Sequence, residues 1–156
     1  MKLATLCYVK SADKTLMLLR NKKANDIHEG KWNGLGGKLA PGESPEECAI
    51  REVYEESGLT ITAPSLRGIL TFPEFSNGED WYVFVFLIDR FQGTLSESEE
   101  GHLEWIDDDK LLELNLWEGD FYFLRAMQQG TFFSGKFTYK NKLLEDHQMI
   151  LHHPVF

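Results

Sequence analysis

The sequence predicts an α/β protein in which a mixed β-sheet lies between helices. Segments with strand character interleave with helical segments along the 156 residues, without the simple alternation of a strand–helix array. The hydrophobic content of 42% is ordinary for a globular protein, and no repeat, low-complexity tract or linker interrupts the chain. We therefore expect one domain over residues 1–156 that is long enough to bury a sizeable core.

The chain opens with two predicted strands, residues 2–10 and 15–20, which are rich in leucine and β-branched side chains. Residues 21–33 follow as a predicted loop. The densest positive segment of the chain lies in or beside this loop and consists of Arg20, Lys22, Lys23 and Lys31. Such a segment is either simply solvated or a set of cations at the mouth of a phosphate site.

Residues 32–38 include three glycines within four positions. Glycine lets a backbone pass close to another group where a side chain would clash. The run is neither a dinucleotide-binding nor a P-loop fingerprint, because it leads into a loop and not directly into a helix. On its own it is weak evidence for a site.

The best-defined element is a helix over residues 45–57. Ser44 can cap its first turn, Pro45 suits the first helical position, and Glu47 completes a capping box. Gly58 supplies the C-terminal stop.

Three glutamates of this helix, Glu52, Glu55 and Glu56, fall on one arc of about 100°. For an arbitrary helix, such residues are most often a solvated face. Like charges so close repel, however, and a hard divalent cation such as Mg²⁺ would relieve the repulsion, because it prefers oxygen ligands and bridges carboxylates to phosphates.

Beyond the helix we predict strands at residues 65–75 and 81–91 around an Asn-Gly turn, and the second is apolar enough to be central. An acidic loop at 93–102 and a short strand at 103–106 follow. The remaining predictions are a short helix or turn at 107–116, a second main helix at 118–129 and a closing hairpin of strands 131–139 and 143–152. The histidines of this last part have no metal-ligand spacing, and they are His147, His152 and His153.

Residues 37–59 match the signature of the Nudix hydrolase family at every specified position. The matching residues are Gly37, Glu43, Arg51, Glu52, Val53, Glu55, Glu56, Gly58 and Leu59. The chain therefore resembles a Nudix hydrolase. The resemblance implies an α/β/α sandwich with a mixed β-sheet, and a metal-dependent pyrophosphohydrolase that acts on a nucleoside diphosphate linked to another group.

The resemblance also implies roles for individual residues. Glu52, Glu55 and Glu56 would hold Mg²⁺, with Mn²⁺ as an alternative, and Gly37 would add a backbone carbonyl ligand. Glu43 and Arg51 would join loop and helix by a charge pair. Arg51 lies on a different helical face from Glu52, so it can point back at the loop while the carboxylates point at the metal. Gly36, Gly37 and Lys38 would contact substrate. Glu100 would be a further metal ligand or general base, and Glu97 and Glu99 are the other candidates.

Segments outside the signature are similar to the MutT-type enzymes, which hydrolyse oxidised purine nucleoside triphosphates. Lys23, Asn33, Trp117 and Asp120 match substrate-contacting positions of that branch. The chain departs from it at Gly119, where an aspartate would be expected, so one polar contact with the base is expected to be missing.

We therefore predict hydrolysis of a purine nucleoside triphosphate, with 8-oxo-dGTP as the candidate, to the monophosphate and pyrophosphate. The alternatives are a Nudix hydrolase of ADP-ribose or a dinucleoside polyphosphate, and a nucleotide sensor that binds without cleaving. The intact carboxylate set speaks against the sensor.

The composition limits the kinds of partner that we expect for the protein. A net charge of −9 argues against binding a nucleic acid polymer, which needs a basic surface. No segment has the length and apolar character of a membrane span or signal peptide, and Cys7 and Cys48 follow no disulfide pattern. We expect a cytoplasmic protein, monomeric or homodimeric, whose partner is a small nucleotide.

Overall fold

The computed structural model describes residues 1–155 and contains ten strands, two α-helices and one 3₁₀ helix. The strands are β1 (Lys2–Ser11), β2 (Lys14–Leu19), β3 (Trp32–Asn33), β4 (Thr60–Thr62), β5 (Ser65–Ser76), β6 (Glu79–Ile88), β7 (Arg90–Gln92), β8 (His102–Asp107), β9 (Phe132–Lys140) and β10 (Leu143–His152). The helices are α1 (Pro45–Ser57), the 3₁₀ helix η1 (Asp108–Glu113) and α2 (Asp120–Gln128).

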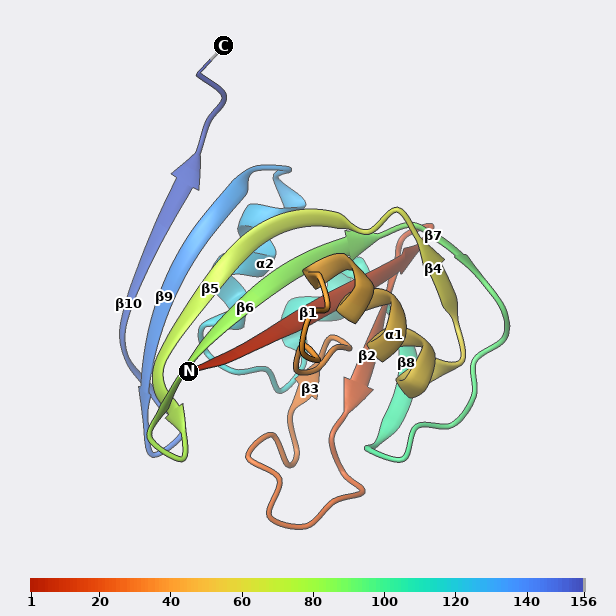
Figure 1. The fold of residues 1–156 in the computed structure, drawn as a ribbon, viewed down its shortest axis with the longest axis horizontal. Coiled ribbons are helices and arrows are strands. Elements are labelled where there is room, and N and C mark those ends of the chain that lie inside the picture. The colour runs from red at the N-terminus through yellow and green to blue at the C-terminus, as the bar shows by residue number, and fades with distance from the viewer. Residues whose placement is uncertain (156) are drawn as a thin grey trace.

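The main sheet has the order β10-β9-β5-β6-β1-β2-β3, and β8 adds to it by pairing with β2 (Figure 1). It is mixed, as predicted, because β1 runs parallel to β6 and β5 runs parallel to β9, whereas the other pairs are antiparallel. The predicted central position of β6 is confirmed, since it lies between β5 and β1.

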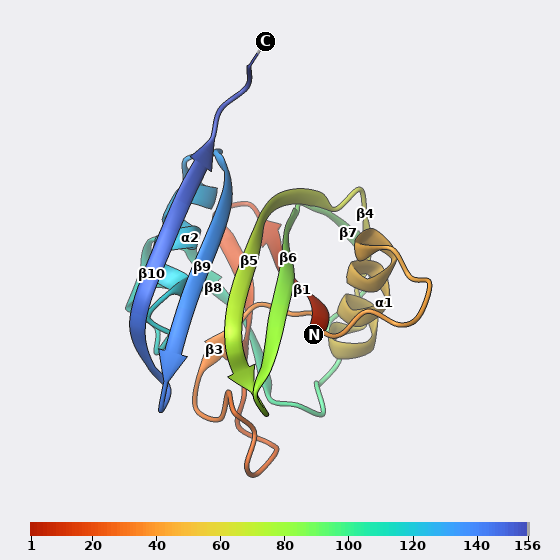
Figure 2. The ribbon, with the colours of Figure 1, turned by 60° about the vertical axis from the view of Figure 1, so that its left-hand side comes forward.

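The two α-helices lie on opposite faces of this sheet (Figure 2). Alternate residues of β1 face opposite cores: Ala4 and Tyr8 pack in the cluster that contains Phe123 of α2, and Cys7 packs in the cluster that contains Val53 of α1. This period of two produces two apolar layers, one under each helix. The α/β/α sandwich expected from the sequence is therefore confirmed.

The predicted boundaries of α1 are confirmed at both ends. The Ser44 side chain accepts a hydrogen bond from the backbone N–H of Glu47, and the Glu47 side chain accepts one from the N–H of Ser44. Gly58 adopts the left-handed conformation, with φ of 80°, and ends the helix.

Two of the predicted segments were wrong, and one strand was not predicted. Residues 32 and 33, predicted as loop, form β3, because the chain returns there to pair with β2. The predicted strand 81–91 is two strands, since β6 ends at Ile88 and β7 pairs instead with β4, which the sequence analysis missed.

In the part of the chain that the structure describes, no helix is both long and apolar enough to cross a membrane.

The parallel pairing of β5 with β9 generates a testable prediction. Gly68 lies opposite Phe133, and a Cβ atom at position 68 would lie 2.2 Å from that fully buried ring. Gly68→Ala should therefore lower the free energy of unfolding by about 1–3 kcal/mol, measured by urea denaturation. Ser65→Ala, at an exposed position of the same strand, should change it by less than about 0.5 kcal/mol. Equal stability of the two variants would contradict this packing.

Candidate active site

The acidic face of α1 lies against the glycine run at residues 34–37. The Oε1 atom of Glu56 accepts a hydrogen bond from the backbone N–H of Gly36 at 2.8 Å. A Cβ atom at position 37 would lie 2.5 Å from the carboxyl carbon of Glu52. Any side chain at position 37 would thus displace Glu52, which explains why glycine is needed here.

Burial and mutual repulsion perturb these carboxyl groups. Burial is the main reason that the pKa of Glu56 rises to about 8; the hydrogen bond from Gly36 opposes this rise, and the nearby negative charges of Glu100 and Glu52 add to it. Burial also raises the pKa of Glu52. A divalent cation between these groups would reverse both effects, because it favours the ionised form of each carboxyl.

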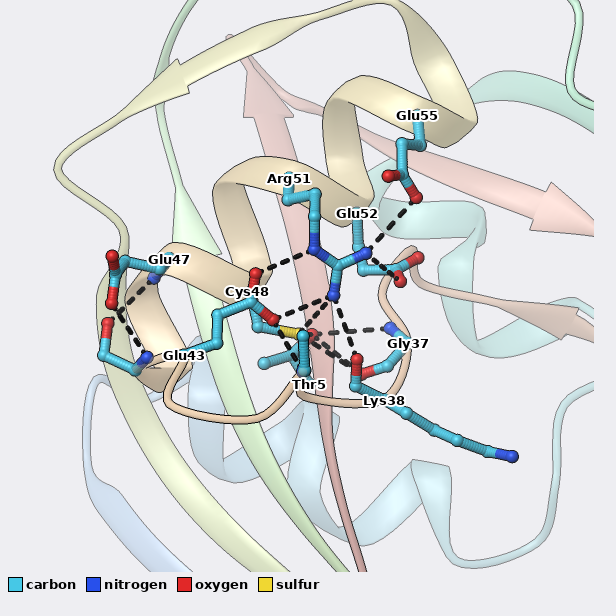
Figure 3. Close-up of polar contacts among 11 residues, drawn as sticks. Thr5, Gly37, Lys38, Glu43, Glu47, Cys48, Arg51, Glu52 and Glu55 are labelled. Carbon is cyan, nitrogen blue, oxygen red and sulfur yellow. Dashed lines mark hydrogen bonds and ion pairs between the residues drawn. The ribbon is translucent and has the colours of Figure 1, made fainter.

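Arg51 organises the negative charge around α1 (Figure 3). Its guanidinium donates to both carboxylate oxygens of Glu43, at 2.7 and 2.9 Å, and to the carbonyl of Lys38 at 3.0 Å. The hydrogen bond from Arg51 is the main reason that the pKa of Glu43 falls to about 2. The predicted charge pair between loop and helix is therefore present.

Arg51 points back at the loop, as predicted, and it also contacts the acidic face of the helix. Its Nη1 atom lies 2.8 Å from Glu52 and 3.3 Å from Glu55. The long side chain lets one guanidinium reach both the loop and the acidic face.

The loop before β8 brings Glu100 toward this cluster. Its carboxylate lies 3.5 Å from Lys23 Nζ and 3.6 Å from Arg20 Nη1, and its charge acts on both Glu52 and Glu56. Glu97 instead pairs with Lys22 at 2.8 Å. Glu99 is exposed. The geometry therefore favours Glu100 among the three candidates.

The carboxylates do not form a preformed metal cage. Within residues 1–155, no three Asp, Glu, His or Cys side chains converge closely enough to hold a metal ion. Each glutamate is instead met by a donor of the protein, such as Arg51, Gly36 N–H or Lys23. The residues nevertheless fit a hard cation, because all the charged candidates are oxygen ligands and two of them are ionised only at a cost.

The geometry does not favour the Gly37 carbonyl as a metal ligand. This oxygen faces β1, where it accepts a hydrogen bond from the Thr5 N–H at 2.9 Å and lies 3.4 Å from Cys48 Sγ. The Gly36 carbonyl has no hydrogen-bond partner among residues 1–155. It is the better candidate, because a backbone carbonyl without a partner can accept a ligand.

Of the residues expected to read a base, Asn33 lies at the other end of the same segment, whereas Trp117 and Asp120 lie just before and at the start of α2. Asn33 has a buried Nδ2 atom without a partner among the described residues. Asp120 is buried at the start of α2, and burial raises its pKa to about 8, so this carboxyl is largely protonated at neutral pH. It therefore offers both an O–H donor and an acceptor.

A cavity of about 480 Å³ lies beside Trp117, and its lining includes Ile27, Phe75 and Tyr139. Trp117, Phe75 and Tyr139 are mutual neighbours, with ring centroids 5.1 to 5.8 Å apart. Of the predicted substrate-binding residues, Asn33, Lys38 and Asp120 do not line this cavity, and Lys38 Nζ lies over the Trp81 ring at 5.5 Å.

Two residues of this region were missed by the sequence analysis. Tyr139 accepts a hydrogen bond from the Gly119 N–H at 2.7 Å, so its hydroxyl occupies the space beside the position where an aspartate was expected. His28 accepts one from the indole of Trp117. No local pattern identifies either residue, because both partners are distant in sequence.

The comparisons with known proteins agree with the site. A model of the NUDIX domain matches residues 1–127. The chain is 34% identical over 152 residues to the oxidized purine nucleoside triphosphate hydrolase of Danio rerio, covering 97% of this chain and 92% of that protein. It is 36% identical over 141 residues to the Nudix hydrolase YvcI of Bacillus subtilis, covering 86% and 85% of the two chains.

A solved structure supports the same assignment. The mutator MutT protein of Bacillus halodurans superposes with a TM-score of 0.84 and 30% identity, covering 96% of this chain and 97% of that one. The family signature on α1, the sandwich and these likenesses lead to one conclusion: this chain belongs to the Nudix hydrolase family.

Proposed function

We propose that this Nudix hydrolase cleaves a purine nucleoside triphosphate, with 8-oxo-dGTP as the candidate, to the monophosphate and pyrophosphate. We also propose that residues 1–156 act as one domain and require Mg²⁺, or Mn²⁺ in its place. The likeness to an oxidized purine nucleoside triphosphate hydrolase over 97% of the chain supports the substrate class.

One observation carries the proposal. The side-chain amide of Asn33 is buried, and its Nδ2 atom has no hydrogen-bond partner among the described residues. Three residues later, the backbone N–H of Gly36 donates a hydrogen bond to Glu56. These two residues are separated by at most about 11 Å of extended chain. A nucleotide bound along this segment would place its base near Asn33 and its phosphates near the glutamates of α1.

At the phosphate end, Glu52, Glu55, Glu56, Glu100 and the carbonyl of Gly36 would hold the cation. A bound divalent cation neutralises phosphate charge and polarises the phosphoryl group. Arg51 orients Glu52 through a 2.8 Å contact. Glu100 lies on a loop from which its carboxylate can accept the proton of an attacking water. Lys23, which pairs with Glu100 in this structure, can bind a phosphate oxygen of the substrate.

At the base end, the donors and acceptors suit a purine such as guanine. The protonated carboxyl of Asp120 can donate to a carbonyl oxygen and accept from a ring N–H, and Asn33 can also do both. The indole of Trp117, at the wall of the cavity, can stack on the purine face.

A substrate panel tests the proposal. Purine and pyrimidine triphosphates, ADP-ribose and a dinucleoside polyphosphate are each mixed with the protein and Mg²⁺, and phosphate is measured with and without a pyrophosphatase. We expect phosphate from 8-oxo-dGTP only when the pyrophosphatase is present, because the product is pyrophosphate. Preference for ADP-ribose, or binding without turnover of any compound, would contradict the proposal.

Mg²⁺ should raise the melting temperature, because it relieves the repulsion among Glu52, Glu56 and Glu100 and binds only the native state. At a hundredfold excess over Kd the gain is about 2.7 kcal/mol, or about 5–10 °C. Glu56→Gln should abolish turnover and most of this shift, measured by thermal unfolding with Mg²⁺ and with EDTA.

The same variant should stay folded without metal, because Gln resembles the protonated carboxyl that burial already favours at position 56. Glu46→Gln, at an exposed position of the first turn of α1, serves as the matched control and should keep both the shift and the activity. An Mg²⁺-dependent rate that survived Glu56→Gln would remove Glu56 from the metal site.

Glu100→Gln should lower kcat by about a hundredfold to ten-thousandfold, the usual contribution of a positioned base. Glu97→Gln should leave kcat nearly unchanged, because Glu97 pairs with Lys22 and is exposed. Steady-state kinetics of both variants, at saturating Mg²⁺, makes the comparison. If the two changes had equal effects, Glu99 would become the next candidate.

Asp120→Ala should reduce kcat/KM for 8-oxo-dGTP about tenfold to a hundredfold, because it leaves donors of a buried base without a partner. The same change should scarcely affect a pyrimidine triphosphate, and competing turnover assays compare the two substrates. A uniform loss on both would show that Asp120, which is buried at the start of α2, supports the fold and does not read the base.

A further inference from the structure

The Trp117 side chain is held by an unusual polar contact. Its indole Nε1–H donates to Nδ1 of His28 at 2.9 Å, and the two rings meet at 84° with centroids 5.6 Å apart. A ring nitrogen can accept this bond only when histidine is neutral. Burial lowers the pKa of His28 to about 4, so the side chain is neutral at physiological pH and remains an acceptor.

The backbone of His28 is fixed on both sides, although it lies in the loop between β2 and β3. Its N–H donates to Oδ1 of Asp26 at 3.1 Å, and its carbonyl accepts from the N–H of Lys31 at 2.8 Å. Asp26 in turn pairs with Arg20 at 2.9 Å. These hydrogen bonds hold the backbone of His28 in place beside the indole.

The other contacts of Trp117 are edge contacts with aromatic rings and one cation over its face, and none of them accepts a hydrogen bond from its N–H. The rings of Phe75 and Tyr139 meet it at 62° and 77°, and Lys31 Nζ lies over the ring at 5.6 Å. His28 is the one residue in the described part of the chain that accepts a hydrogen bond from the indole. Packing holds the ring at the cavity wall, and His28 supplies the one directional polar contact that fixes where its N–H points.

We propose that His28 is a positioning residue, which holds the indole of Trp117 in the orientation that stacks on the purine of the substrate. This inference rests on the proposed function, because it assigns a support to the base subsite of the same site. His28 itself does not touch the reacting atoms, so its loss should weaken substrate binding and leave the chemical step intact.

The test compares His28→Leu, which removes the acceptor, with His28→Asn, whose Oδ1 atom can take the place of Nδ1. His28→Leu should raise KM for 8-oxo-dGTP about tenfold with kcat within about twofold, the signature of lost binding that substrate and transition state share. His28→Asn should restore KM to within about threefold of the wild-type value. His147→Leu is the matched control, since His147 stacks on Tyr122 at 4.1 Å and lies outside the site.

A second readout does not depend on activity. The four tryptophans give four indole N–H signals in a protein labelled with ¹⁵N-tryptophan, and Trp117→Phe identifies the signal of Trp117. His28→Leu should shift this signal and leave the other three in place, and His28→Asn should return it toward its wild-type position.

Failure of the inference and failure of the proposed function are distinguishable. Absence of purine triphosphate turnover in the wild-type protein would contradict the proposed function. The inference itself is overturned if His28→Leu leaves the Trp117 signal unmoved, if it lowers the melting temperature with KM unchanged, or if His28→Asn behaves as His28→Leu does.

Discussion

The charge on helix α1 is the constraint on which the rest of the site depends. Carboxylates at 52, 55 and 56 can lie beside a buried helix face only if other segments supply donors for them. Arg51 supplies one set, and through Glu43 it ties the loop before the helix to the helix itself. The Gly36 N–H supplies another. The loops around α1 are therefore ordered by the same charges that suit the helix to a divalent cation.

Strand β1 connects this site to the core. Residues Lys2 to Val9 of this strand pair with β6, and its buried side chains face both apolar layers. The same strand holds the glycine run, because Thr5 and Cys7 donate backbone hydrogen bonds to Gly37 and Leu35. The backbone at position 36 lies so close to β1 that an added Cβ atom would be 2.1 Å from the Thr5 carbonyl. The position of the glutamate-binding amide is thus set by the packing of the central sheet.

Local signals explain what could be predicted from the sequence. The two ends of α1 depend on residues close together in the sequence, namely the capping box of Ser44 and Glu47 and the left-handed Gly58. Their geometry agrees with the prediction. Pairings between distant segments could not be predicted in this way. The contact of Gly68 with Phe133 depends on the parallel pairing of β5 with β9, which are separated in the sequence by several other elements. The hydrogen bond from Trp117 to His28 joins residues 89 positions apart. Such contacts follow from the tertiary fold and leave no periodic pattern.

The departure at Gly119 has a packing cause. A Cβ atom there would lie 2.6 Å from the Phe137 ring and 2.7 Å from the Tyr139 hydroxyl, so these aromatic side chains exclude an aspartate. The expected polar contact is therefore not simply lost: the Tyr139 oxygen accepts the Gly119 N–H, and its own proton has no acceptor within residues 1–155. Burial, and then the charge of Asp120, raise the pKa of Tyr139, so this hydroxyl stays neutral. The neutral hydroxyl of Tyr139 therefore stands beside Asp120 where the carboxyl of an aspartate at position 119 was expected. The site keeps a polar group there, but this group does not carry a negative charge.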